Sequence, residues 1–150
     1  MEKQTKNYPR QGTEKQPVFG ILCRNGTVWA EVVNDVGADT LQPLISQKVS
    51  TGSIVCSDIW KAYTGIAALG HVHCLVNHGE GQYSDRKGNH INGLEGFRCY
   101  LKRKLASKGG IRREKIPLYL EEYVWRYNHR SDPERIKTRR IIQLLEKIRC

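Results

Sequence analysis

The chain has 150 residues, of which 39% are hydrophobic, enough for one domain with a modest core. Its net charge of +10 favours a polyanionic partner such as nucleic acid, since the basic residues also cluster along the sequence. No apolar run is long enough to span a membrane and no signal peptide opens the sequence, so we expect a cytoplasmic, nucleoid-associated protein with no membrane partner.

The first half of the chain begins with a polar stretch and continues with short apolar runs separated by turn residues. Residues 1–16 contain almost nothing that a core would bury, and we expect a flexible arm. Asn25-Gly26 is the strongest turn signal, and Pro43 falls early in a helical stretch, where proline is tolerated. In chain order we expect strands over 18–23 and 28–33 joined by a turn at 24–27, a helix over 38–49, and a buried strand over 54–56.

Helical spacing dominates the second half of the chain. Leu94, Phe97, Leu101 and Leu105 recur as on a helix face that packs on a core. Asp132-Pro133 supplies a cap followed by a first-turn proline. The expected elements are a helix over 59–69 loosened near Gly65, a strand over 71–76, a loop over 77–89, a helix from His90 to Leu105 closed by Gly109-Gly110, an amphipathic helix over 115–127, and a last helix from Asp132-Pro133 to about Arg149.

The order of these elements predicts the fold class. A hairpin followed by alternating strands and helices indicates an α/β domain with a mixed sheet. No linker is long enough to divide the chain into two domains. We therefore assign residues 17–130 to one α/β domain, preceded by the arm and followed by a basic C-terminal helix over 131–150.

Two acidic residues are placed where α/β proteins carry functional groups. Asp58 lies just past the carboxyl end of a strand, and Glu95 lies at the start of a helix that can pack across the sheet. Two carboxylates so placed could converge on Mg²⁺, which takes one or two carboxylates and completes its shell with water and phosphate. The structural alternatives are a helix N-cap for Asp58 and, for Glu95, a capping box with Asn92.

Other clusters of polar residues support weaker interpretations. His71, His73, Cys74 and His78 are zinc-ligand types, but one cluster lacks the paired signature of zinc sites, and a strand with satisfied polar residues is favoured. The 5 cysteines form no Cys-x-x-Cys motif and are expected to be reduced thiols. For the basic residues of the last helix, phosphate binding and a solvated helix face are equally supported.

Five short motifs together resemble one known family. They are SDIWKAY at 57–63, VNH at 76–78, HINGLEGF at 90–97, LKR at 101–103 and WRYN at 125–128. In these motifs, and over about residues 18–130, the chain resembles bacterial insertion-sequence transposases of the DDE, ribonuclease-H-like class, of the ISXO-like group. The catalytic helix of that group begins H-x-N-G-x-E-x-F, and its next helix ends in W/F-R-Y-N.

The resemblance implies a fold, a reaction and a set of site residues. Such proteins hold two divalent ions, Mg²⁺ or Mn²⁺, between carboxylates on a mixed sheet, cut DNA at transposon ends, and join the freed 3′-hydroxyl to target DNA. Asp58 corresponds to the second catalytic acid and Glu95 to the third, both as metal ligands. The implied supporting residues are His78, His90 and Asn92. The expected DNA-binding residues are Lys102, Arg103, Lys104, Arg126, Arg135, Arg139 and Arg140.

The same resemblance implies partners, and one departure from the family limits the expected activity. The partners are transposon-end and target DNA, and transposase subunits in a homo-oligomer or a mixed oligomer with full-length protein. The family's first acid lies in a D-E-x-Y type segment on the central strand, whereas residues 1–16 contain no Asp and no strand-like run. We expect this strand to be missing, which should leave a gap between the hairpin and the strand over 54–56. A truncated transposase, inactive alone, is therefore expected; a non-catalytic DNA-binding protein or inhibitor is the alternative.

Overall fold

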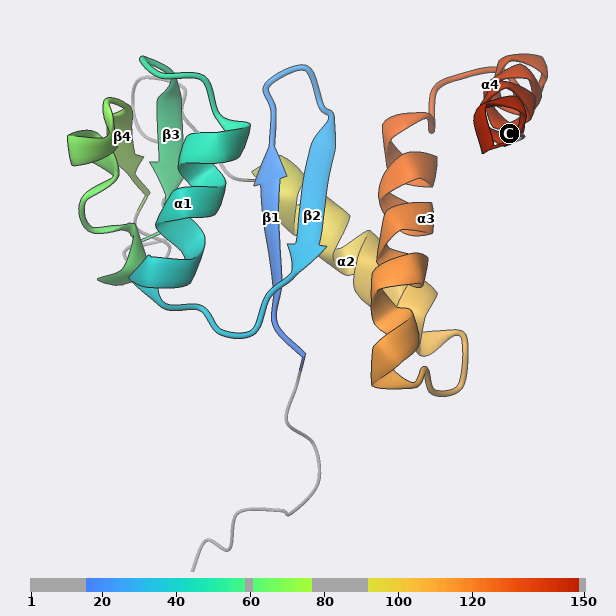
Figure 1. The fold of residues 1–150 in the computed structure, drawn as a ribbon, viewed down its shortest axis with the longest axis horizontal. Coiled ribbons are helices and arrows are strands. Elements are labelled where there is room, and N and C mark those ends of the chain that lie inside the picture. The colour runs from blue at the N-terminus through green and yellow to red at the C-terminus, as the bar shows by residue number, and fades with distance from the viewer. Residues whose placement is uncertain (1–15, 59–60, 77–91, 149–150) are drawn as a thin grey trace, which may run out of the picture.

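The computed structural model describes residues 16–58, 61–76 and 92–148 (Figure 1). The arm expected over residues 1–16 and the loop expected over 77–89 therefore lie outside the described residues, apart from Gln16. The side-chain amide of Gln16 donates a hydrogen bond to the Val33 carbonyl oxygen at 3.0 Å. No helix in the described part of the chain is long and apolar enough to cross a membrane.

The predicted hairpin is confirmed. Its strands β1 (Val18–Leu22) and β2 (Val28–Val32) pair antiparallel. In the turn, the side-chain oxygen of Asn25 accepts hydrogen bonds from the backbone N–H of Thr27 at 3.0 Å and from its hydroxyl at 2.7 Å. Gly26 has a φ of 84°, a left-handed conformation that glycine adopts without steric cost. Because these interactions are local, the Asn-Gly pair is enough to specify the turn.

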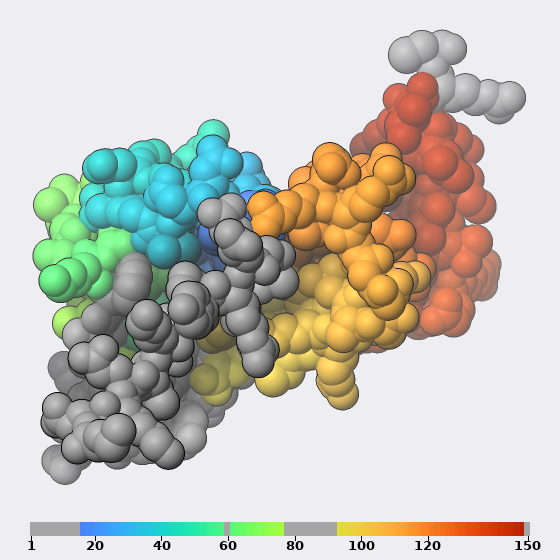
Figure 2. Space-filling model, turned by 90° about the horizontal axis from the view of Figure 1, so that it is seen from below, coloured from blue at the N-terminus to red at the C-terminus, as the bar shows by residue number. Residues whose placement is uncertain are grey.

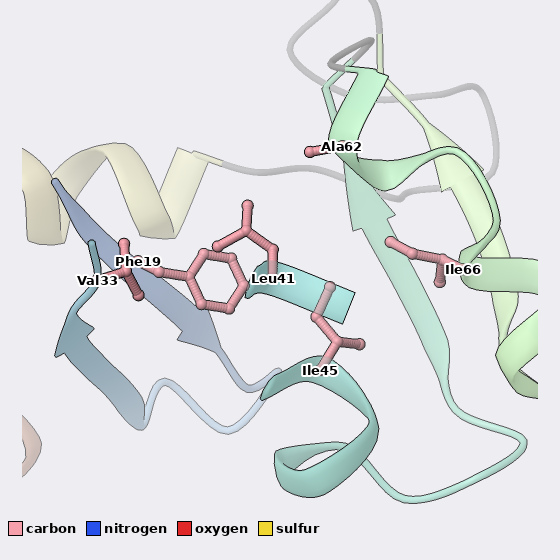
Figure 3. Packing of buried hydrophobic residues seen from close by; sticks show 6 residues of the cluster. All are labelled: Phe19, Val33, Leu41, Ile45, Ala62 and Ile66. Carbon is pink, nitrogen blue, oxygen red and sulfur yellow. The ribbon is translucent and has the colours of Figure 1, made fainter. Parts of the chain in front are cut away.

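One face of the hairpin packs against α1 (Ala38–Lys48). Phe19 and Trp29 lie on this face, with ring centroids 6.3 Å apart in an edge-to-face arrangement. From α1, the side chains of Leu41 and Ile45 are only 1% and 2% exposed and fill the space beside Phe19 (Figure 3). The opposite face of the hairpin packs against α2 (Asn92–Ala106) and α3 (Ile116–Asn128). The buried members of that second core are Val28, Phe97, Leu101, Leu120 and Tyr123.

A second sheet pairs β3 (Ile54–Ser57) with β4 (Val72–Leu75) in parallel. The helix predicted over 59–69 is interrupted near Gly65, as expected, but in the described part of this range it is not an α-helix. The connection between the two strands instead contains two 3-10 helices, η1 (Lys61–Tyr63) and η2 (Ile66–Leu69). Both strands were predicted, and each begins or ends within one residue of its expected limits.

A backbone angle and a pair of hydrogen bonds explain why no continuous helix forms in the connection. Gly65 has a φ of 106°, which interrupts right-handed helical geometry. The side-chain amide of Gln42 in α1 donates hydrogen bonds to the carbonyl oxygens of Ala62 at 3.2 Å and Thr64 at 2.8 Å. Those carbonyls would accept from residues four positions later in an α-helix. A tertiary contact from α1 therefore replaces the helical bonds.

The four described strands form two sheets of two strands each. The order of the elements predicted one mixed sheet, and the family resemblance predicted a gap in it between the hairpin and the strand over 54–56. In Figure 1 the inner strands of the two sheets are β3 and β1, and α1 lies in front of β3, on the side toward β1. The core cluster around α1 contains Phe19 from the hairpin and Ile66 from the connection, so α1 joins the two sheets. The α/β class is confirmed, whereas the ribonuclease-H-like topology and the missing strand stay predictions.

The last helix, α4 (Glu134–Ile148), agrees with the helix predicted at the end of the chain. None of its side chains is buried. Its orientation depends on Arg140, whose Nε lies 3.3 Å from Oδ2 of Asp132 and whose Nη1 lies 3.4 Å from Nε2 of His129. These contacts tie α4 to the end of α3 and to the turn between them.

Candidate metal site and nucleic-acid surface

The first candidate ligand, Asp58, directly follows the carboxyl end of β3 and is exposed. The residue before it, Ser57, is buried, and its hydroxyl donates to the Asp58 carbonyl oxygen at 2.9 Å. The same hydroxyl lies 2.8 Å from Nε2 of His73 on the neighbouring strand. Burial lowers the pKa of His73, so its imidazole is neutral at pH 7. The backbone of Asp58 is thus anchored while its carboxylate is exposed to solvent.

Tyr63 is a site residue that sequence reasoning missed. Burial raises the pKa of its hydroxyl, and the negative charge of Asp58 raises that pKa further. The phenol therefore lies within electrostatic range of the carboxylate and stays protonated at pH 7 as a hydrogen-bond donor. The motif SDIWKAY contains both residues, but only the fold of the connection, with Tyr63 in η1, brings the tyrosine back toward Asp58.

The second candidate ligand, Glu95, lies in the first turn of α2 and is exposed. Phe97 and Leu101 bury the inner face of this helix, so Glu95 and Lys102 share the outer face, as the helical spacing predicted. A carboxylate in the first turn is also favoured by the positive end of the helix dipole. The position therefore suits a metal ligand and a capping residue alike.

The other expected members of the site are less fully described. His78 and His90 lie outside the described residues, and Asn92 is the first residue of α2, without a described side chain. Within the described ranges, no group of three or more His, Cys, Asp or Glu side chains could hold a metal ion. For the described histidines and cysteines, this also leaves the zinc interpretation without support. His71 itself is buried, and its Nδ1 atom has no hydrogen-bond partner in the described part.

The expected DNA-binding residues fall into groups according to the contacts that their side chains make. Arg126 is held by Glu122 at 2.8 Å and Arg140 by Asp132 at 3.3 Å, so these two cations are partly neutralised. Lys104 lies over the ring of Tyr100, with its Nζ 5.9 Å from the ring centroid. The remaining four are exposed and form no ion pair with any residue in the described ranges. They are Lys102 and Arg103 on α2, and Arg135 and Arg139 on α4.

The end of the WRYN motif holds the hairpin in place, a role that its sequence did not predict. The side chain of Asn128 accepts from the Val28 backbone N–H at 2.7 Å and donates to the Val28 carbonyl oxygen at 2.8 Å. Just beyond it, Arg130 lies over the ring of Tyr127 at 4.2 Å and donates to the carbonyl oxygen of Gly26 at 3.3 Å. Because the partners are about a hundred positions apart in sequence, no local pattern reveals this contact.

These features define a basic α/β protein with one exposed carboxylate at the carboxyl end of a strand and a second in the first turn of a helix. The profile of the ISXO2-like transposase domain matches residues 1–128. The chain therefore belongs to the ISXO2-like transposase family, as its motifs predicted. It is also 35% identical, over 102 residues, to an uncharacterized transposase-like protein of Haemophilus influenzae; the matched region covers 68% of this chain and 81% of that protein. No solved structure matches the chain.

Proposed function

We propose that the chain is a DDE-type DNA transposase domain in which Asp58 and Glu95 hold a divalent metal ion, Mg²⁺ or Mn²⁺. The observation that carries this proposal is the placement of Asp58, anchored through Ser57 at the carboxyl end of β3 and exposed beyond it. Two exposed carboxylates are the kind of ligand that these hard cations take, with water and phosphate completing the shell. The proposed substrates are transposon-end and target DNA, which places the protein with DNA in the cytoplasm.

The chain's own residues would act on the DNA by holding and orienting it. Lys102 and Arg103 lie about two turns beyond Glu95 on the same helix and would neutralise DNA phosphates near the carboxylate. The metal, when bound, supplies positive charge for the attacking and leaving oxygens of an in-line displacement at phosphorus. Tyr63, whose protonated hydroxyl lies within electrostatic range of Asp58, would be available there as a hydrogen-bond donor.

The two sheets support a finer proposal about the fold. We propose that they are parts of one ribonuclease-H-like sheet whose central strand, with the third acid, lies outside the described residues. In the described ranges, β1 pairs with β2 alone and β3 with β4 alone, while α1 packs against both halves. A strand between β1 and β3 would join the pairs into one mixed sheet. With Asp58 and Glu95 as its only described candidate acids, the chain alone is expected to be impaired in catalysis, because two acids hold metal ions less firmly than three.

A non-catalytic role is the second candidate function. The described ranges contain no group of three metal-ligand side chains, while four of the expected DNA-binding residues on α2 and α4 are exposed and form no ion pair there. A protein with these properties could occupy transposon ends, alone or in a mixed oligomer with full-length transposase, without cutting them. Such a role needs the DNA surface and not the metal site.

A strand-transfer assay separates the two functions. The purified chain is incubated with Mn²⁺ and DNA that carries the ends of its element, alongside a version extended at the N-terminus by a strand bearing D-E-x-Y. We expect no joined product from the chain alone, and joined product from the extended version that Asp58→Asn abolishes. Product from the chain alone that Asp58→Asn abolishes would contradict impaired catalysis. DNA binding by both versions, without product from either, would favour the non-catalytic role.

A further inference from the structure

The connection between α2 and α3 forms an open surface pocket of about 540 Å³. α2 ends at Ala106, and the turn that follows contains Gly109 and leads to Gly110, with φ angles of 67° and 122°; the sequence predicted this glycine pair as the close of the helix. In Figure 1 this connection lies at the lower end of the two helices, and Figure 2 looks onto that end, with the end of α2 and the start of α3 in gold and orange. None of the expected DNA-binding residues lines this pocket.

The charge around the pocket is positive. Lys108, Arg112 and Lys115 line it and are exposed, and none of them forms an ion pair with another residue in the described ranges. The acid in the lining, Glu122, is already paired with Arg126 at 2.8 Å. Three uncompensated cations around one hollow raise its local potential and attract an anion that carries several charges.

The pocket also exposes apolar surface between these cations. Leu118 lies on its wall and is 61% exposed. Beside it, the ring of Tyr119 stacks against Tyr123 with centroids 6.2 Å apart, and the Lys108 Nζ lies 5.7 Å from the Tyr119 centroid. Aromatic and apolar surface next to cations is the combination that binds single-stranded nucleic acid, because unpaired bases stack while their phosphates are neutralised. A duplex keeps its bases stacked inside and would leave Leu118 and Tyr119 unused.

The pocket and the candidate metal site are joined by α2, so the length of this helix gives the distance between them. Lys108 follows Glu95 by 13 residues (108 − 95) in and just beyond α2, so the two are about 20 Å apart along the helix axis. Lys102 is exposed between them on the outer face. A strand that passes Glu95 must therefore extend about 20 Å along α2 to reach the pocket.

We propose that the α2–α3 pocket binds an unpaired DNA strand about 20 Å along α2 from the position that Glu95 faces. The pocket would thus hold the single-stranded part of a cleaved or frayed transposon end, while the cations of α2 and α4 hold duplex. This inference rests on the proposed function in DNA transposition.

The test compares two fluorescein-labelled probes, a thymidine single strand of about twelve nucleotides and a duplex of the same length. Fluorescence anisotropy measures the affinity of the protein for each probe across a salt series. In the double variant Arg112→Gln and Lys115→Gln, single-strand affinity should fall roughly tenfold at low salt, and the slope of log affinity against log salt should fall by about 1.4, since each contact contributes about 0.7. Duplex affinity should change little. The control, Lys48→Gln with Lys147→Gln, removes the same charge elsewhere and should leave single-strand binding unchanged.

A second variant separates base contact from charge. Leu118→Ser should weaken single-strand binding without changing its salt slope, and should not affect duplex. Two results in the Arg112/Lys115 variant would contradict single-strand binding at the pocket: equal losses for single strand and duplex, or unchanged single-strand binding. If the wild type still binds duplex with a steep salt dependence, the proposed function would stand. A wild-type protein that binds neither DNA would overturn both.

Discussion

The β1–β2 hairpin and the β3–β4 pair are both two-stranded sheets, but their faces are covered to different extents. The hairpin has α1 on one face and α2 with α3 on the other, and Asn128 clamps the backbone of Val28. In the second sheet, Val55 joins the core around α1, whereas the cross-strand neighbours Ile54 and Val72 are 62% and 54% exposed. The hairpin is therefore the structural centre, and the sheet that carries Asp58 is the less protected part.

This difference matters for function because one candidate ligand belongs to the well-covered part of the molecule and the other to the less covered part. Glu95 lies on α2, which packs on the well-covered hairpin, while Asp58 follows β3 at the less covered sheet. A metal site between them needs both parts held in one geometry to within about 0.5 Å. Local opening free energies differ within a protein according to how well each part is packed. We therefore expect the Asp58 side to limit the site.

The largest expected effect is a core truncation on the hairpin side. Leu120 is 2% exposed within the core of α2, α3 and the hairpin, and Leu120→Ala should lower the free energy of unfolding by about 2–5 kcal/mol through lost burial and a cavity. By contrast, Val72→Ala on the exposed face of β4 should change it by less than about 0.5 kcal/mol. Urea denaturation followed by circular dichroism measures both values. Similar losses for the two variants would contradict the comparison.

A smaller loss is expected at the clamp that holds the hairpin to α3. Asn128→Ala removes both partners of the Val28 backbone groups in a partly buried site, and should cost about 1–3 kcal/mol. Asn34→Ala, at an exposed position, is the matched control and should be nearly neutral. The same urea titration measures the change. If the two asparagine variants proved equally stable, the clamp would have no structural role.

The smallest expected effect is a pH dependence confined to the second sheet. Burial lowers the pKa of His73 from its ordinary 6.5, so the folded sheet binds this proton less readily than the unfolded chain. Stability is therefore complete above pH 6.5 and falls as the pH drops below that value toward the lowered pKa. Amide exchange of β3 and β4, corrected for its intrinsic pH dependence, should show easier opening in this range, while hairpin amides should not. The same pH dependence in His73→Gln would exclude this histidine as its cause.

The elements predicted from sequence are those whose signals are local. The Asn25-Gly26 turn depends on neighbouring residues, and the apolar stripe of α2 depends on spacing within one helix, so both could be read from the chain. The interruption at Gly65 was predicted, whereas the 3-10 form of the segment over 61–69 was not, because Gln42, about twenty positions earlier, bonds to two of its carbonyl oxygens. Strand pairing is also non-local: the order of the elements predicted one mixed sheet, and only the family resemblance predicted a gap between the hairpin and β3.

The same distinction applies to the candidate site. Asp58 and Glu95 were found because each follows or begins a recognisable element and because their motifs resemble a family. The contribution of Tyr63 depends on the shape of the η1 connection, and that of His73 on the parallel register that brings it to Ser57. Asn128 depends on a contact between the two ends of the domain. Sequence reasoning therefore found the charged residues and missed the residues that position them.

Titration with Mn²⁺ by isothermal calorimetry tests the central claim, that Asp58 and Glu95 together hold a divalent ion. We predict a weak site that is lost in both Asp58→Asn and Glu95→Gln, while Glu121→Gln, which changes an exposed acid on α3, leaves it unchanged. All variants should keep the wild-type circular dichroism spectrum. Because Gln also serves at the capping position, an unchanged titration in Glu95→Gln would show that Glu95 caps α2 instead, and would contradict the account.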